Sequence, residues 1–207
     1  ASLRVIFTTY DPELYIPLTL FVYQMLYLVF GINAIGYHVL SLLLHTSSAL
    51  LLTWLTFTIL WAQFKERADE KLLGGASIAV GAMFLLHPLH TEAVSWAAAM
   101  KDQLSTFFYL LAFLTYLQFR SSAENKPYYY SLLFFFLGLM SKVMVLTLPA
   151  VFLLLEDLRG RSIFGYKELW KRLLPYGALS GFFLVVALFG KSDIVARTSL
   201  FQTVLMA

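Results

Sequence analysis

Apolar runs separated by short polar or charged segments make up most of this chain. The pattern predicts an all-α, polytopic membrane protein, because apolar runs bounded by charged or turn-forming residues are typical of helices that cross a bilayer. About six spans are expected, at residues 34–61, 74–86, 103–119, 128–140, 143–155 and 174–190.

A shorter apolar segment, PLTLFVYQMLYLVF at residues 17–30, precedes the spans. Pro17 suits the first turn of a helix, where its missing N–H would have no partner. The 14 residues would extend about 21 Å, short of the roughly 30 Å hydrocarbon core. We therefore predict that residues 1–33 form the tail of an external loop and a helix in the membrane interface. Residues 191–207 are expected to be an external loop and the start of a next span.

Residues 128–155 allow two topologies: one long span with Lys142 in its middle, or two short helices that meet at Lys142. In the second, ten of the 15 Lys and Arg residues lie in loops on one side, as the positive-inside rule expects of cytoplasmic loops. A single span would separate the most basic loop from the other two. We therefore predict the hairpin, with both chain ends and residues 87–102 on the non-cytoplasmic side. The ten basic residues are Lys65, Arg67, Lys71, Arg120, Lys126, Arg159, Arg161, Lys167, Lys171 and Arg172.

Composition agrees with a protein of the lipid bilayer and narrows its chemistry. Of 207 residues, 60% are hydrophobic and 13% are charged, about half the charged fraction of a soluble domain. The absence of cysteine excludes disulfides and thiolate chemistry. The net charge of +3 comes from dispersed basic residues, so no nucleic-acid partner is expected. The first residue is alanine and the chain stops in an apolar run, so we expect a piece of a longer protein.

One segment, HPLHTEAVSWAAAMKDQLSTFF at residues 87–108, gathers polar side chains between two apolar runs. His87, His90 and Glu92 are residue types that bind zinc, but Pro88 interrupts the helix and their spacing fits no common ligand pattern. We therefore expect neither a metal nor another cofactor. These residues could cap the end of a span by hydrogen bonding. They could also form a polar wall for a substrate with hydroxyl groups, which is the interpretation we prefer.

The same segment contains the dipeptide Lys101-Asp102 directly before a predicted span. Asp102 suits the cap or the first turn of that helix, where negative charge is favourable. Lys101 gains nothing from the positive end of the helix dipole, which favours an anionic partner for it. Glu156 and Asp157, on the cytoplasmic side, are interpreted as a solvated helix end.

Lys142 lies between two short apolar helices, so its ammonium must extend towards water or pair with an anion. If each helix covers only about 20 Å, the ammonium reaches the outer headgroup layer, where lipid phosphates lie. Asp11 and Glu13 are expected on the same side and could approach it.

His38 and His45 share one face of a span, where they are either functional or neutral and hydrogen-bonded to a neighbouring helix.

Four stretches carry a resemblance to a known family. They are YIPLTLFVYQ, GINAIGYHVLSLLLH, HPLHTEAVSWAAAMKDQLSTFF and GLMSKVMVLTLPAVFLLLEDL, in this order. Together they resemble the membrane half of the transmembrane and tetratricopeptide-repeat O-mannosyltransferases and their bacterial relatives. That family belongs to the GT-C superfamily of glycosyltransferases that use polyprenyl-phosphate sugars. The resemblance covers residues 7–158 and, more loosely, the remainder.

The resemblance implies a GT-C-like helical bundle over residues 1–207, as a fragment, with an active site on the periplasmic or luminal face. The membrane would be a bacterial inner membrane or, in a eukaryote, that of the endoplasmic reticulum. An acidic residue of the first external loop is implied as the general base or as the group that orients the acceptor, and this chain holds only the tail of that loop, with Asp11 and Glu13. Met100 stands where relatives often have arginine, and Val143 where they often have proline or glutamate.

The implied reaction is the attack of a hydroxyl, on a protein or glycan, on the anomeric carbon of a polyprenyl-phosphate-linked mannose or related hexose. The candidate catalytic carboxylates are Asp102, Glu92, Asp11 and Glu13. A fixed cation would stabilise the leaving phosphate. Lys142 is the first candidate for this cation and Lys101, oriented by Asp102, the second. His87 and His90, with Glu92, would line the pocket for sugar or acceptor.

Two other functions use the same residues differently. A transporter or flippase of an anionic lipid would use the histidines and lysines, but it predicts paired repeats or helices broken in corresponding halves, which the sequence does not display. A non-catalytic membrane scaffold is the third hypothesis. An acidic pair upstream of Ala1 would favour the transferase, and its absence would favour the other two.

Overall fold

The computed structural model of the chain describes residues 6, 15–122, 124–158 and 167–205, without the side chains of 158, 168 and 190–205. Every regular element in this part is helical, which confirms the all-α prediction. The elements are α2 (Pro17–Phe30), α3 (Ala34–Phe64), α4 (Glu70–Leu86), α5 (His90–Ser95), η1 (Ala97–Ala99), α6 (Met100–Ser121), α7 (Lys126–Ser141), η2 (Val143–Thr147), α8 (Leu148–Leu158) and α9 (Lys167–Leu205).

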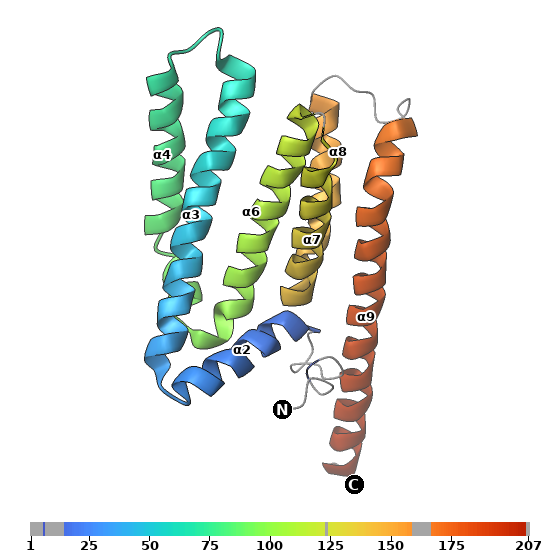
Figure 1. The fold of residues 1–207 in the computed structure, drawn as a ribbon. Coiled ribbons are helices and arrows are strands. Elements are labelled where there is room, and N and C mark those ends of the chain that lie inside the picture. Colours follow the sequence, from blue (N-terminus) through green and yellow to red (C-terminus); the bar gives the residue numbers. More distant parts are fainter. Residues whose placement is uncertain (1–5, 7–14, 123, 159–166, 206–207) are drawn as a thin grey trace.

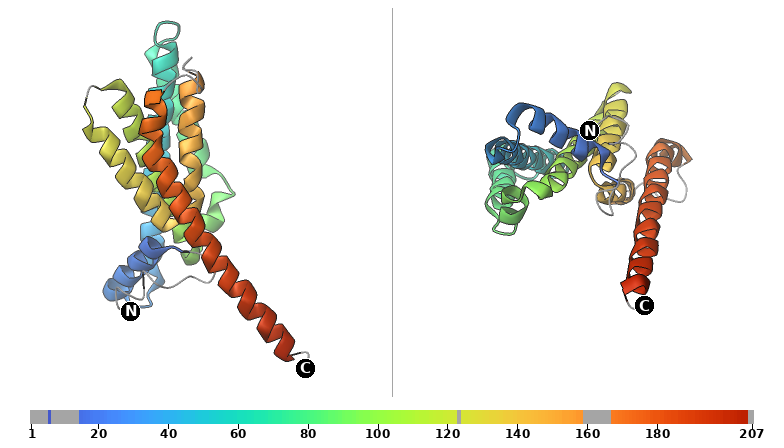
Figure 2. Two further views of the ribbon diagram at one scale, coloured as in Figure 1. Left: turned by 90° about the vertical axis from the view of Figure 1, so that its right-hand side faces the viewer. Right: turned by 90° about the horizontal axis from the view of Figure 1, so that it is seen from below.

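The longer helices α3, α4, α6, α7, α8 and α9 run roughly along one axis, and α2 lies across one end of them (Figures 1 and 2). Helix α2 has the bounds that the sequence predicted, with Pro17 in its first turn. Gly31 ends it with φ of 59°, a left-handed backbone that glycine adopts without strain. Its crosswise orientation is the one expected of an interfacial helix.

Two of the described helices are long and apolar enough to cross a membrane, judged by length and composition: α3, and residues Leu169–Phe189 of α9. Helices α4, α7 and α8 have 17, 16 and 11 residues, so none extends beyond about 26 Å, against a hydrocarbon core of roughly 30 Å. The count of six spans therefore stays a prediction.

Residues 128–155 fold as a helical hairpin and not as one long helix (Figure 1). Helix α7 ends at Ser141, and Lys142 has the extended backbone angles φ −161° and ψ 131°. The chain then turns through η2 into α8. Gly138 makes this turn compact, because a Cβ placed on it would lie 3.0 Å from a methyl group of Val145. The single-span alternative is therefore wrong.

The connections that carry the basic residues are gathered at one end of the bundle (Figure 1). The link between α3 and α4, the link between α6 and α7, and the facing ends of α8 and α9 lie there, opposite α2. This is the arrangement expected from the loop charges. The first of these loops is shorter than the predicted 62–73, because Asp69 caps α4 by accepting a hydrogen bond from the N–H of Lys71. At the far end α9 continues beyond Gly190, where we placed the end of the last span.

The main core lies between α6, α7, α8 and α9 and is rich in aromatic rings. The rings of Tyr116 and Phe152 stack with centroids 3.8 Å apart. A buried chain of hydrogen bonds crosses the core: the Tyr176 hydroxyl donates to Ser131 Oγ at 2.8 Å, and Ser131 donates to the carbonyl of Ala112 at 2.7 Å. These contacts tie α9, α7 and α6 together.

Helices α3 and α4 pack through small residues. Ala49 on α3 and Ser77 and Gly81 on α4 are buried. A Cβ on Gly81 would collide with the hydroxyl of Thr53, so glycine sets the closeness of this contact. Contacts of this kind are typical of helix pairs in membranes, where small side chains let backbones approach.

Candidate functional site

The first feature of the site is an ion pair between two segments that are distant in sequence. The ammonium of Lys142, at the break between α7 and η2, donates to Oδ1 of Asp102, in the first turn of α6. The side chains are 25% and 39% exposed, so a ligand can reach both. Both residues stand out in the sequence, where the prediction pairs Asp102 with Lys101. In the structure the carboxylate contacts Lys142.

Helix α2 holds the two segments that carry this pair. The Thr19 hydroxyl donates to the carbonyl of Ser141, next to Lys142, at 3.2 Å, and this contact is buried. The Tyr23 hydroxyl donates to the carbonyl of Ala97, in η1 just before α6, at 2.7 Å. Sequence reasoning missed both residues, because a threonine and a tyrosine in an apolar helix give no local sign of partners this far along the chain.

A cavity of about 220 Å³ adjoins the ion pair. Its lining includes the two carboxylate residues Glu92 and Asp102 and the indole of Trp96, which is 58% exposed. Carboxylates accept hydrogen bonds from hydroxyl groups, and an indole offers a flat apolar face. The cavity therefore suits a small polyhydroxylated ring. Trp96 was visible in the sequence block at residues 87–108, but we assigned it no role.

Three histidines meet beside this segment. The rings of His45 and His90 lie 5.3 Å apart, and those of His87 and His90 lie 5.6 Å apart. His45, from α3, shares a hydrogen bond of 3.2 Å with the carbonyl of Leu85, on α4. This contact is the hydrogen bond to a neighbouring helix that the structural interpretation of His45 expects. His38 is exposed and lies outside the group.

The histidines line a second cavity, of about 450 Å³, together with Thr46, Thr91 and Ser95. His90 Nδ1 lies 2.7 Å from the carbonyl of Phe84, so it acts as a donor there. Four apolar residues, Leu42, Leu85, Leu86 and Val94, complete the lining, so the polar wall that we prefer for this segment stays a prediction. Among the described residues no group of three or more His, Cys, Asp or Glu side chains has a geometry that could hold a metal ion.

Of the three other predicted site residues, only Lys101 belongs to the part of the chain that the structure describes, and it lines neither cavity. Asp11 and Glu13 lie outside the described residues. Lys101 is half-buried in the first turn of α6.

The interpretation of Glu156 as a solvated residue is wrong. Its carboxylate accepts two hydrogen bonds from the guanidinium of Arg120, at 2.6 Å and 3.0 Å, and its side chain is 1% exposed. The partner lies 36 positions away on α6, so the local sequence gave no sign of it. Asp157 is exposed as expected.

No family model and no solved structure matches the chain. Similar curated proteins exist. The chain is 32% identical over 152 residues to human protein O-mannosyl-transferase TMTC4. The aligned region covers 67% of the chain and 20% of that protein. It is 34% identical over 100 residues to Drosophila melanogaster protein O-mannosyl-transferase Tmtc1, covering 48% of the chain and 10% of that protein. The chain is 30% identical over 102 residues to human protein O-mannosyl-transferase TMTC3, and this region covers 49% of the chain and 10% of that protein.

The chain thus spans about a fifth or less of the length of these relatives. The match with human TMTC4 nevertheless extends over two thirds of the chain itself. The resemblance carried by the four sequence stretches is confirmed: the homologues of this chain are the protein O-mannosyl-transferases of the transmembrane and tetratricopeptide-repeat family.

Proposed function

We propose that this chain is part of the membrane domain of a glycosyltransferase that moves mannose, or a related hexose, from a polyprenyl phosphate to a hydroxyl group on a protein. The names of the relatives support the transfer of mannose to protein. The observation that carries the proposal is the ion pair between Lys142 and Asp102 beside a cavity lined by carboxylates and an indole. An anionic donor and a hydroxyl-bearing ring are the ligands that such a site suits.

The proposed orientation follows from the charges of the bundle. The helices along its axis cross the membrane as six spans, with the basic connections in the cytoplasm. The end with the ion pair, the two cavities and α2 then faces the periplasm or the lumen. There α2 lies in the headgroup layer, and Lys142 has the depth of the lipid phosphates.

The chemistry follows from the charges that form during the reaction. An acceptor oxygen forms a bond to the anomeric carbon, and the bond from that carbon to the phosphate oxygen breaks. The hydroxyl proton passes to a carboxylate. The candidates for this carboxylate are Glu92 and Asp102 and, outside the described residues, Asp11 and Glu13. The departing lipid phosphate gains negative charge, which the ammonium of Lys142 stabilises.

Asp102 has a second role in this scheme. Without donor, it compensates the charge of Lys142, and its own carboxylate belongs to the lining of the smaller cavity. A bound phosphate would take over the contact with Lys142. The carboxylate of Asp102 would then be free to accept a proton or a sugar hydroxyl.

The donor class is tested with the full-length protein in vesicles. Labelled mannose is offered either on a polyprenyl phosphate or on a nucleoside diphosphate, with an acceptor protein present. We expect label in the acceptor only with the lipid-linked donor, and at least tenfold less label with Asp102→Asn. Transfer from the nucleotide donor, or movement of the lipid across the membrane without transfer, would contradict the proposal.

A further inference from the structure

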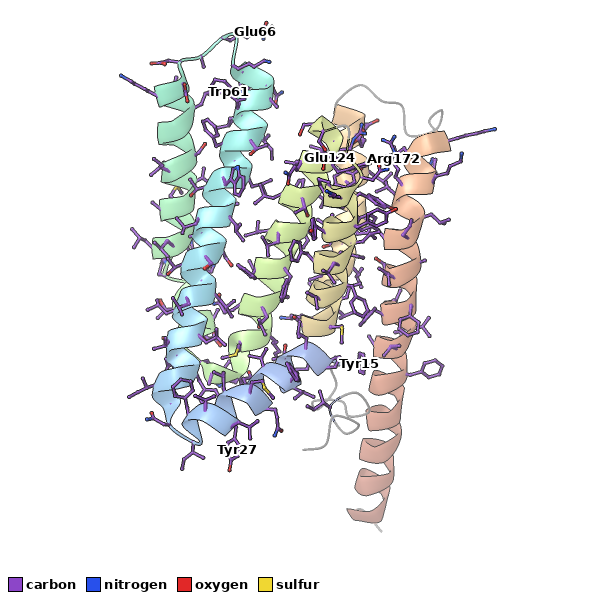
Figure 3. The ribbon with its side chains drawn as sticks, in the orientation of Figure 1. Tyr15, Tyr27, Trp61, Glu66, Glu124 and Arg172 are labelled. Carbon is purple, nitrogen blue, oxygen red and sulfur yellow. The ribbon has the colours of Figure 1, made fainter. Side chains whose placement is uncertain are left out.

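A third cavity, of about 400 Å³, lies at the end of the bundle opposite the Lys142–Asp102 pair. It is formed where α6 ends, α7 begins and α9 begins. Its lining includes Phe119, Arg120, Ser122, Asn125, Tyr128 and Arg172. Figure 3 shows Arg172 and Glu124 at this end of the bundle, with Trp61 and Glu66, while Tyr27 on α2 lies at the other end.

The two arginines of this cavity differ in their partners. The charge of Arg120 is compensated by the bidentate contact with Glu156. Arg172 has no carboxylate partner among the described residues, and its guanidinium lies 5.4 Å from the centre of the Phe119 ring. Contact with an aromatic face holds a guanidinium and leaves its N–H groups available at the edge. The cavity therefore offers one uncompensated, positioned cation.

The lining of the cavity supplies further hydrogen-bond donors. Ser122 and Asn125 contribute a hydroxyl and an amide to the lining. The Tyr128 hydroxyl donates to the carbonyl of Arg172 at 2.9 Å, which fixes the start of α9 against α7. A phosphate group, with several acceptor oxygens and negative charge, is the ligand that this set of donors fits.

The position of Arg172 along α9 indicates a lipid as the source of the phosphate. The apolar stretch of α9 begins at Leu169, so Arg172 lies in its first turn. Exposed aromatic side chains surround this level: Trp170 is 49% exposed, Tyr129 66% and Tyr130 55%. Exposed Trp and Tyr next to an apolar stretch are typical of the headgroup layer of a membrane.

We propose that this cavity binds the phosphate of an anionic membrane lipid, on the face opposite the proposed transfer site. Basic pockets between helices on the cytoplasmic side are known to bind such headgroups. Arg172 would contact the phosphate, and the exposed side chain of Leu174 would contact the acyl chains. The site depends on the bundle crossing a bilayer but not on sugar transfer, so it can fail or succeed independently of the proposed activity.

The test uses the full-length protein in nanodiscs of phosphatidylcholine with increasing phosphatidylglycerol. Lipid binding is measured by native mass spectrometry, and folding by thermal unfolding in pure phosphatidylcholine. We expect Arg172→Gln to bind phosphatidylglycerol at least tenfold more weakly, and Arg172→Lys to retain part of the binding. The control is Arg67→Gln, which removes an exposed arginine at the same end of the bundle and should bind like the parent protein.

Three outcomes would overturn the proposal. Equal binding by Arg172→Gln and Arg67→Gln would mean that only general surface charge attracts the lipid. If Arg172→Gln fails to fold, Asn125→Ala takes its place, and binding of phosphatidylglycerol equal to that of the parent protein would show that the cavity is not the binding site. If inorganic phosphate stabilises the protein in detergent as strongly as the lipid does, and through Arg172, the ligand is a free anion and the lipid assignment is wrong.

Discussion

The ion pairs Arg120–Glu156 and Lys142–Asp102 lie at opposite ends of this bundle, and their exposure gives them different roles. The side chains of Arg120 and Glu156 are 9% and 1% exposed, whereas those of Lys142 and Asp102 are 25% and 39% exposed. A buried bidentate pair is costly to break and fixes the helices that carry it. A half-exposed pair is held weakly, so it can exchange one partner for a ligand.

The buried pair gives a prediction for stability. Glu156→Gln leaves the guanidinium of Arg120 without a compensating charge, which should lower the free energy of unfolding by about 3–5 kcal/mol. Asp157→Asn changes the exposed neighbour and should lower it by less than about 0.5 kcal/mol. Thermal unfolding of the full-length protein in mild detergent measures both. Equal midpoints for the two variants would show that the buried pair is unimportant for stability.

Trp96 gives a prediction for the smaller cavity. If its indole face contacts the sugar, Trp96→Ala should raise the KM for the lipid-linked donor by about two- to tenfold, whereas Trp96→Phe should retain most of the affinity because it keeps a flat ring. Trp54→Ala, which removes an exposed indole on α3, is the matched control. A KM unchanged by Trp96→Ala, measured in steady-state transfer assays, would remove Trp96 from the site.

At the scale of elements, α2 connects the two halves of the ion pair. Thr19 and Tyr23 contact the backbone next to Lys142 and just before α6, so a shift of α2 would move the two charged segments relative to each other. The helix lies across one end of the bundle (Figure 1). We therefore expect α2 to position the site without touching the reacting atoms.

A pair of near-isosteric changes tests this positioning role. Thr19→Val leaves the buried carbonyl of Ser141 without its donor, at a cost of about 1–3 kcal/mol. We expect a lower kcat with little change in KM for Thr19→Val and for Tyr23→Phe. Tyr27→Phe, on the exposed side of the same helix, should behave like the parent. Loss of stability with an unchanged kcat in the folded fraction would indicate a purely structural role.

The elements themselves could be predicted well from the sequence. The bounds of α2 and the break at Lys142 follow from local patterns, namely a proline start, a glycine end and a lysine between two apolar runs. The contacts between elements could not be predicted in the same way. Asp102 and Lys142 are 40 positions apart, so the sequence singled out each residue but not their pairing. Glu156 was misread for the same reason, because a buried and an exposed carboxylate look alike without their partners.

At the scale of the whole molecule, the chain has one basic end and one end with the candidate site (Figure 1). This polarity predicts how the protein lies in the membrane. The chain has no cysteine, so single cysteines report position without background from this domain. Ser122, between α6 and α7, and Ser95, in α5, are both exposed and lie at opposite ends.

The prediction for orientation uses these two serines. With a membrane-impermeant thiol reagent and any cysteines elsewhere in the full-length protein replaced, Ser122→Cys should react only from the cytoplasmic side. Ser95→Cys should react only from the opposite side. Labelling of both positions from one side would show that the bundle does not cross the membrane as proposed, and it would also remove the basis for the lipid site at Arg172.

The central claim is that Lys142 binds the phosphate of the donor, and its removal tests this claim most directly. In the full-length protein, Lys142→Met should lower kcat at saturating donor by about ten- to a hundredfold, the equivalent of one lost charge-assisted contact. Lys142→Arg should recover part of the rate, since it keeps the charge with a different geometry. Lys71→Met, at the basic end, should have no effect. Normal turnover and normal donor affinity in a stably inserted Lys142→Met protein would contradict the account.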